Sequence, residues 1–401
     1  MASVGAVSTQ ETAPAPELTP VIRDRPVVVL GLLWAGLSFA RSLGRAGVPV
    51  SGISMHPHEF GVRSRYLRDV QHAHGDVDVL AALRAAADGE RPVLLPERDD
   101  HVELVLRHWD EVSALYDLPM PADPEVARRL RGKATLPEEA ARSGVPAPPT
   151  AAADSEQTLR SLELRPPFLL KPVEGQHFAG SFGEKVLVAE TVDELVGAWR
   201  EARARGFETV VQELVPEAHH KIWSLFVYIG RSGRPLATVT GVKVRQGPIR
   251  FGTSAVFRTR PQARVRDLGL RLLETAGYRG FAHVEFAHDH RDDEFKLLEV
   301  NTRVPMWAGV AMSRYLDMAR IAYDDLCGRP EPEPRNFEEE VSWSFLAKDL
   351  WVSLGMARRR ELSPRAFLGP YVHRKKVRAV LAADDPLPAL GVVRYLGSKL
   401  A

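Results

Sequence analysis

The sequence predicts a mixed α/β fold that opens with a parallel sheet and continues into a region richer in strands. An apolar, β-prone run at 26–31 precedes a turn, a helix at 37–46 and a second apolar run at 47–53, which is the pattern of a βαβ unit. A further strand is expected at 91–96, with a helix from 99 to 116. The later segments expected to be strands are 167–172, 185–189, 210–216, 221–229, 236–244 and 252–258, before a helix at 264–276.

Length and charge limit the class of protein. A chain of 401 residues can hold two or three domains, and 53 basic residues balance 52 acidic ones, which argues against general binding to nucleic acid. The single cysteine, Cys327, excludes an intramolecular disulfide framework. We see no apolar run of membrane-spanning length and no secretory signal, so a cytoplasmic protein is expected. Residues 1–25, rich in Ala, Pro, Thr and Ser, are expected to form a disordered tail.

Two glycines, Gly31 and Gly36, mark the turn between the first strand and the first helix. A helix N-terminus at such a turn can bind a phosphate group. The spacing departs from GxGxxG, and no Lys-Ser/Thr pair follows as it does in a P-loop. We therefore expect a tight strand-to-helix turn, with a contact to a small ligand as the alternative.

Two apolar segments near residue 290 each deliver an acidic side chain. Alternate residues of a strand point to one face, so Glu299, Asn301 and Arg303 are expected to lie together, and Glu285 can join them from a neighbouring strand. Unpaired charges are costly within apolar strands. Hard oxygen ligands suit Mg²⁺, whose remaining positions waters and phosphates fill. This pattern favours phosphoryl transfer driven by a nucleotide.

Basic residues precede this pair of segments. Lys133 lies in a region, 124–144, expected to be helical, and Lys171 ends a buried strand before a glycine-rich loop at 173–184. Lys243 and Arg245 alternate along another strand, so both cations are expected on one face.

The order of these residues resembles the ATP-grasp superfamily, which includes D-alanine–D-alanine ligase, biotin carboxylase and carbamoyl phosphate synthetase. Within it, the chain looks most like the carboxylate–amine ligases related to D-aspartate ligase. The segments that carry this closer resemblance are 36–50, Ser64-Arg65-Tyr66, Asp349-Leu350-Trp351 and Asp384-Asp385-Pro386. The resemblance covers roughly residues 26–401.

This resemblance implies a domain order and a reaction. A Rossmann-like pre-ATP-grasp domain would span 26–123, and a two-lobed ATP-grasp domain 124–330, with a lid lobe at about 166–212. A helical segment, 331–401, would pack on that core. A carboxylate would attack the γ-phosphate of ATP, giving an acyl phosphate and ADP. An amine would then displace phosphate to form an amide.

The resemblance also assigns roles to residues. Arg303, Arg245 and Lys243 would act on the transferring phosphoryl group or the carboxylate. The residues expected to bind nucleotide are Lys133, Lys171, Gln212, Glu213, Leu214, Val215 and Lys221. Mg²⁺, or Mn²⁺ in its place, would be held by Glu285, Glu299 and Asn301. The loop at 173–184 would cover the phosphates, and whether its His177 touches them is left open.

The substrate side is less defined. Asp99, Asp100 and His101 could contact the donor or simply cap a helix, while Trp223 and Trp307 could face the acceptor or lie in the core. The partners expected are a small carboxylate and a small amine, without nucleic acid or membrane, and a homodimer is possible. Alternatives keep the acyl phosphate but use a hydroxyl or thiol nucleophile, or retain nucleotide binding without catalysis. A dehydrogenase is disfavoured because GxGxxG is missing.

Overall fold

The N-terminal domain is a four-stranded parallel sheet in the order β3-β2-β1-β4. The computed structural model of the chain describes residues 25–87, 89–173, 177–216, 222–248 and 252–400. The domain contains β1 (Val27–Leu30), α1 (Trp34–Arg45), β2 (Val50–Ser54), η1 (Phe60–Arg63), β3 (Val70–His72), α2 (Gly75–Ala87), β4 (Val93–Pro96), α3 (Asp99–Arg107) and α4 (Trp109–Leu115). All four residues of β1 and of β4 are buried, as expected for inner strands of a covered parallel sheet. The expected βαβ opening is confirmed, and the helix expected at 99–116 divides at His108.

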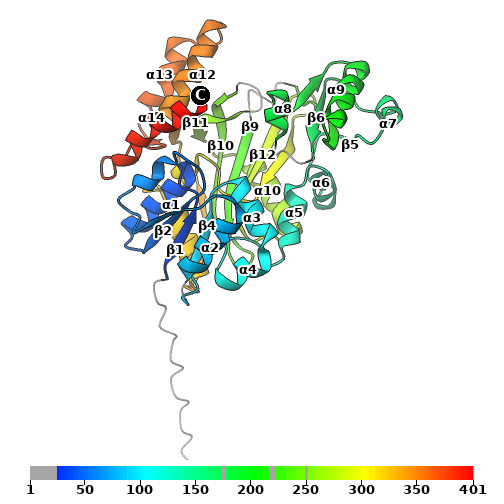
Figure 1. Cartoon of the computed structure of the whole chain (residues 1–401). Coiled ribbons are helices and arrows are strands. Elements are labelled where there is room, and N and C mark those ends of the chain that lie inside the picture. The colour runs from blue at the N-terminus through cyan, green and yellow to red at the C-terminus, as the bar shows by residue number, and fades with distance from the viewer. Residues whose placement is uncertain (1–24, 88, 174–176, 217–221, 249–251, 401) are drawn as a thin grey trace, which may run out of the picture.

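An eight-stranded sheet forms the centre of the molecule (Figure 1). Its main path runs β13-β12-β9-β10-β11-β17-β18, and β16 pairs with β10. The strands are β9 (Ile222–Ile229), β10 (Pro235–Gly247), β11 (Thr253–Thr259), β12 (Gly280–Asp289), β13 (Glu294–Asn301), β16 (Arg335–Phe337), β17 (Ser342–Ser344) and β18 (Lys376–Arg378). Four further helices belong to this part of the chain. They are α5 (Pro124–Arg131), α6 (Leu136–Ser143), α10 (Ala263–Thr275) and α11 (Met318–Leu326). A two-stranded hairpin, β14 (Met312–Ser313) and β15 (Leu316–Asp317), precedes α11.

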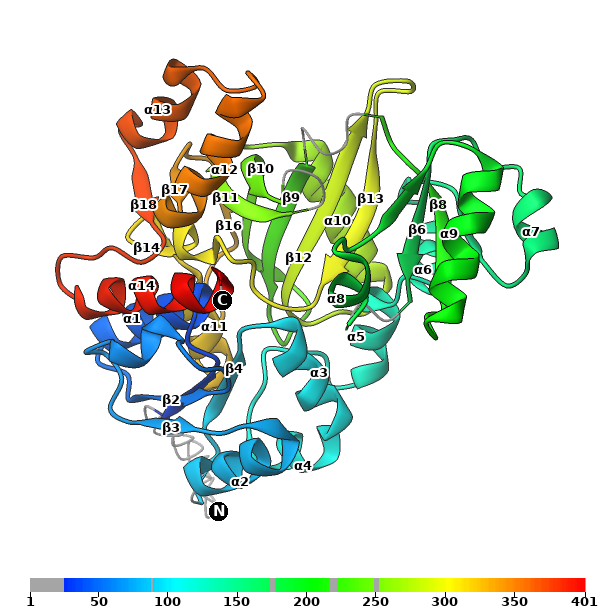
Figure 2. The same cartoon turned by 45° about the horizontal axis from the view of Figure 1, so that its top comes forward.

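A small lobe stands beside this sheet (Figure 2). It holds a second, antiparallel sheet in the order β5-β8-β6-β7. Its elements are β5 (Thr150–Ala152), α7 (Glu156–Arg160), β6 (Phe168–Pro172), α8 (Phe178–Phe182), β7 (Leu187–Ala189), α9 (Val192–Ala204) and β8 (Thr209–Glu213). Because β5 belongs to this sheet, the lobe begins earlier than the expected residue 166.

The C-terminal region differs most from expectation. Helical segments were expected after residue 330, and α12 (Leu346–Arg358), α13 (Pro364–Val372) and α14 (Leu387–Leu400) are present. The same region also supplies β16, β17 and β18 to the large sheet. These strands have three residues each, too short to show the alternation by which a strand is recognised in sequence.

Two segments singled out in the sequence meet in space. Asp385, which precedes α14, accepts hydrogen bonds from Arg41 Nε (2.9 Å), Ser64 Oγ (2.7 Å) and the Arg65 backbone N–H (3.0 Å). Its neighbour Asp384 forms a two-point ion pair with Arg45 at 2.7 and 2.9 Å. These two acidic residues therefore fasten the segment before α14 to the N-terminal domain.

Candidate active site

The two expected acidic residues face each other on neighbouring strands. Glu285 on β12 lies directly opposite Glu299 on β13 in the antiparallel register. The Asn301 side-chain amide donates to Glu299 Oε1 at 3.0 Å, and Lys243 Nζ lies 2.8 Å from Glu285 Oε1. Two carboxylates and an amide oxygen are thus gathered as the sequence predicts.

The charges of this acidic pair are strongly coupled. Burial raises the pKa of Glu285, and the nearby Glu299 adds to the rise while Lys243 opposes it. Burial would raise the pKa of Glu299 as well, but Lys243 and the hydrogen bond from Asn301 bring it below its usual value. Opposed carboxylates resist ionising together. A divalent cation between them would remove that repulsion, so the donor set fits Mg²⁺.

Lys171 enters the site from the small lobe. It lies on β6, and its Nζ donates to the side-chain oxygen of Gln212 on β8. Burial lowers the pKa of Lys171 to about 8, with Glu299 acting to raise it and Lys133 acting to lower it. A phosphate ligand would strongly stabilise the charged form of a lysine held in this way, because a nearby anion offsets the loss of hydration that burial causes.

Lys133 lies in a turn and not within a helix, which corrects the expectation for 124–144. Helix α5 ends before Gly132, and α6 begins after Thr135. A Cβ atom on Gly132 would lie 2.3 Å from Thr135 Oγ1, so the tight turn requires glycine. The turn directs Lys133 Nζ to the carbonyl of Pro172 at 2.7 Å, beside the end of β6. Burial also lowers the pKa of Lys133, and Glu299 opposes that shift.

Arg303 follows β13 and connects two domains. Its guanidinium pairs with Asp99, the first residue of α3 in the N-terminal domain, and lies 3.3 Å from Asn301 Oδ1. Its Nε atom is buried and has no hydrogen-bond partner among the described residues. That unused N–H gives Arg303 capacity to bind an oxyanion.

The strand β10 separates the two cations that were expected on one face. Its pairing with β11 shifts register between Lys243 and Arg245, and a bulge of this kind redirects side chains. Arg245 turns to the C-terminal helices, where Nε and Nη2 bond Asp349 at 2.6 and 2.8 Å. Both side chains are almost fully buried. Arg245 therefore lies in a structural ion pair and not beside the acidic pair with Lys243.

The segment expected to bind adenine makes hydrogen bonds and apolar contacts with other parts of the protein. Gln212 binds Lys171 and donates to Thr150 Oγ1 at 2.8 Å, while Glu213 accepts from the Arg165 backbone N–H at 2.8 Å. The Leu214 N–H donates to the carbonyl of Pro167, and Val215 packs in a small apolar cluster. Contact with adenine stays a prediction for this segment. Lys221 lies outside the described residues.

The glycine-rich loop contains a short helix that the sequence analysis missed. Phe178, which begins α8, is buried and stacks on Phe182 at a ring-centroid distance of 4.6 Å. His177 precedes it, exposed, with a positive φ of 67°. The two phenylalanines anchor this part of the loop to the small lobe.

Two further residues were not assigned roles from the sequence. Lys348, on α12, has a pKa lowered to about 7 by burial and by the charges of Lys185 and Lys243. His283, on β12, lies 3.4 Å from Glu285, and burial followed by the charge of Lys243 lowers its pKa to about 3. No local sequence pattern indicates a role for Lys348. It comes near β10 only because α12 packs against that strand in the folded protein.

Carboxylates of the protein itself accept hydrogen bonds from the backbone N–H groups that follow Gly31. Glu97 accepts hydrogen bonds from the backbone N–H groups of Leu33 (2.7 Å) and Ala35 (2.9 Å) at the start of α1. Glu59 accepts from the N–H of Leu32 at 2.8 Å. Side-chain anions thus occupy donors that a phosphate would use, which supports the structural reading of the turn. Trp223 and Trp307 are likewise core residues.

The parallel N-terminal sheet, the small antiparallel lobe and the large sheet together form the ATP-grasp fold that the sequence predicts. The chain resembles two solved structures of this class. Biotin carboxylase from Campylobacter jejuni, in a β,γ-ATP complex, aligns with a TM-score of 0.62 and 16% identity over 79% of this chain and 73% of that one. N5-carboxyaminoimidazole ribonucleotide synthetase, in an ADP complex, aligns at 0.63 and 16% over 80% and 81%.

Sequence comparison points in the same direction. The chain is 25% identical over 259 residues to D-aspartate ligase from Enterococcus faecium (strain Aus0004). This alignment covers 61% of the present chain and 61% of that relative. No family model matches the chain. Among the described residues, every helix is too short or too polar to cross a membrane.

Proposed function

We propose that this protein is an ATP-dependent ligase that joins a small carboxylate to an amine. The observation that carries the proposal is the acidic pair, Glu285 and Glu299, surrounded by Lys133, Lys171 and Lys243. ATP and a carboxylate are both anions, so bringing them together requires cations that offset their repulsion. A site that combines metal-binding oxygens with several lysines supplies both requirements.

The proposal gives each group of residues its own role. Glu285, Glu299 and Asn301 would hold Mg²⁺, which when bound neutralises phosphate oxygens and polarises the transferring group. Lys171 and Lys133 would bind the phosphates from the small-lobe side. Arg303 would use its free Nε–H on the transferring phosphoryl group or on the substrate carboxylate.

The reaction would proceed in two steps. A carboxylate oxygen forms a bond to the γ-phosphorus of ATP, and the bond to the β-phosphate oxygen breaks, which gives an acyl phosphate and ADP. The amine nitrogen then bonds to the acyl carbon, phosphate leaves, and the nitrogen loses a proton. Because water would destroy the acyl phosphate, exclusion of water by the small lobe is part of the proposal.

The comparisons support this reaction class and suggest where to search for substrates. A relative named D-aspartate ligase, and an L-amino acid ligase from Bacillus licheniformis that aligns with a TM-score of 0.56 and 14% identity over 76% of this chain and 74% of that one, favour amino acids as one substrate. A cytoplasmic location, a homodimer and the use of Mn²⁺ stay predictions.

The direct test measures release of ADP and of phosphate with Mg²⁺ and ATP across pools of carboxylates and amines. The pools should contain D-aspartate and L-amino acids. Glu299→Ala is the test variant, and Glu294→Ala is its control, because Glu294 lies on the same strand and forms a partly exposed ion pair with Arg264.

The ligase is supported if release of ADP and phosphate requires one carboxylate pool and one amine pool. Glu299→Ala should abolish this release, and the control Glu294→Ala should keep it. Release that continues when hydroxyl or thiol compounds replace the amine would favour the alternative nucleophile. Nucleotide binding without turnover in any pool would contradict the proposal and favour a module that binds nucleotide without catalysis.

A further inference from the structure

A second cluster of ligand-type side chains lies in the N-terminal domain, outside the acidic pair. His56 follows β2, Glu59 precedes η1, and His101 lies on α3. One potential ligand atom from each residue lies within 4.8 Å of the others. The three come from segments that follow β2 and β4, the parallel strands on either side of β1, and ligands bind at such strand ends in open α/β sheets.

Two of these side chains are buried with unused polar atoms. Glu59 and His101 are 2% and 0% exposed. Among the described residues, Glu59 Oε1 and His101 Nε2 have no hydrogen-bond partner. Buried polar atoms are almost always paired, because an unpaired one has lost its hydrogen bonds to water without replacement. Two such atoms at one place indicate a group that the protein alone does not supply.

The orientation of both imidazoles suits a metal ion. His56 Nε2 lies 2.8 Å from Asp100 Oδ2, which leaves Nδ1 for the cluster. A histidine ligand commonly donates its other N–H to a carboxylate in this way. His101 Nδ1 accepts a hydrogen bond from the Arg98 backbone N–H at 3.3 Å, so Nε2 is the ring nitrogen that is left for the cluster.

Two buried carboxylates, Glu59 and Glu97, interact with each other beside the cluster, and the charge of Arg98 acts on both. The backbone N–H groups at the start of α1 satisfy Glu97 and one oxygen of Glu59. One carboxylate oxygen of Glu59 lies within 4.8 Å of a ring nitrogen of each of the two histidines.

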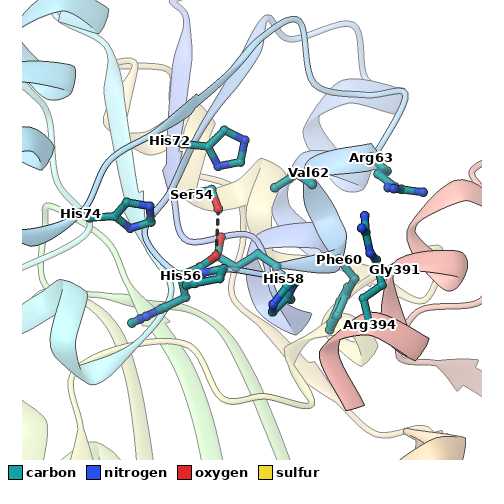
Figure 3. A pocket seen from close by; sticks show the side chains of 12 residues that line it. Ser54, His56, His58, Phe60, Val62, Arg63, His72, His74, Gly391 and Arg394 are labelled. Carbon is teal, nitrogen blue, oxygen red and sulfur yellow. Dashed lines mark hydrogen bonds between the residues drawn. The ribbon is translucent and has the colours of Figure 1, made fainter. Parts of the chain in front are cut away.

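A pocket opens onto two of the three residues, His56 and Glu59. It has a volume of about 190 Å³ and is lined by His56, Glu59 and other polar residues, including His72 and His74 (Figure 3). An ion could therefore enter from solvent, as a binding site requires.

We propose that His56, Glu59 and His101 bind a divalent transition-metal ion, for which Zn²⁺ is the best match. Two imidazoles and one carboxylate are a set that Zn²⁺ accepts, and three protein ligands leave one position open. Zinc ligands lie about 2.0–2.2 Å from the ion, so the side chains would approach one another by roughly 1 Å. The ion would fasten the segment after β2 to α3, whose first residue, Asp99, pairs with Arg303.

The test uses Zn²⁺ alone, without nucleotide, so that it does not depend on the proposed ligase activity. Full-length protein is stripped with a chelator, incubated with Zn²⁺ and washed, and its metal content and melting temperature are measured. The wild type is expected to retain about one equivalent of Zn²⁺ and to melt at a higher temperature with the metal. Co²⁺ in place of Zn²⁺ should give visible absorption bands that report its nitrogen and oxygen ligands.

The variants decide which residues bind the ion. His56→Ala and Glu59→Gln should lose the bound equivalent and the rise in melting temperature. His56 is the safer substitution, because its side chain is 40% exposed. His74→Ala, in the same pocket, and Glu299→Ala, in the acidic pair, should bind Zn²⁺ as the wild type does.

Equal Zn²⁺ retention by wild type and His56→Ala would overturn the proposal. So would the absence of retained Zn²⁺ in the wild type, which would mean that water bridges the unused atoms. Loss of Zn²⁺ in Glu299→Ala with retention in His56→Ala would also overturn it, by moving the ion to the acidic pair.

Discussion

Lys243 and Arg245 lie two positions apart on β10 yet serve different regions. Lys243 pairs with Glu285 in a cluster that keeps a second carboxylate, Glu299, and several other cations nearby. Arg245 and Asp349 form a closed unit in which Tyr371 Oη adds a hydrogen bond to Asp349 at 2.6 Å. The first pair is available to a ligand, and the second is complete without one.

The difference shows how the chemistry of a cation suits its task. Arginine stays charged at any ordinary pH and binds a carboxylate through two parallel hydrogen bonds. Such a pair is rigid and suits a junction between β10 and the C-terminal helices. A lysine presents a compact charge that can change partners, which suits a site where metal and phosphate must replace protein contacts.

The largest effect should follow from breaking the structural pair. In Asp349→Ala, Arg245 remains charged, buried and unpaired, which costs about 3–5 kcal/mol. Chemical denaturation should show this loss of unfolding free energy. Asp349→Asn should cost less, because its amide oxygen can still accept a hydrogen bond. A loss below about 1 kcal/mol in Asp349→Ala would make the pair no more important than an exposed one.

Breaking the other pair should affect activity instead. In Lys243→Met, Glu285 can take up a proton, since its pKa is already raised to about 7, so stability should change by less than about 1 kcal/mol. Removal of one positioned cation should lower turnover by about 10²–10³-fold. Rates of ADP release and melting curves, measured on the same preparation, check both parts. A large loss of stability with normal turnover in Lys243→Met would contradict this prediction, because Lys243 would then have a structural role like that of Arg245.

The pH dependence of stability can isolate Lys171. Its pKa falls from 10.5 to about 8 in the folded protein, so between these values the unfolded chain binds a proton that the folded chain does not. Stability should therefore rise as pH increases through that interval. Lys171→Met should reduce this rise, to which Lys133 and Lys348 also contribute because their pKa values are lowered too, and denaturation at several pH values will show the difference. Lys185→Met, an exposed control, should keep the wild-type slope.

The smallest effect should come from the exposed acidic residue beside α14. Arg45 and Asp384 are 42% and 45% exposed, and such a pair contributes about 0.2–1 kcal/mol. Asp384→Asn should therefore cost less than Asp385→Asn, whose carboxylate is buried against Arg41. Melting curves of the two variants give the comparison, and equal losses would contradict it.

Local patterns predicted the parts of the fold that are formed by neighbouring residues. The βαβ opening, the opposed strands that carry Glu285 and Glu299, and the placement of Asn301 all follow from alternation and apolar runs. The position of Lys171 at the end of β6 was recognised in the same way.

Features that depend on distant contacts could not be predicted. The bulge that separates Lys243 from Arg245 changes the face on which each side chain lies, and alternation alone cannot show it. Asp99 became the partner of Arg303 only because the N-terminal domain packs beside β13. The three short strands after residue 334 gain their structure by pairing with a sheet already formed.

The contact of Arg41 with Asp385 joins residues 344 positions apart. During synthesis, at about 5–20 residues per second, α1 would emerge many seconds before its partner. Until then Arg41 would lack that carboxylate, and β11 would present an open edge where β17 later pairs. The nascent protein therefore carries an unfinished sheet and an unpaired cation at the same time, and both are completed by the same late stretch of chain.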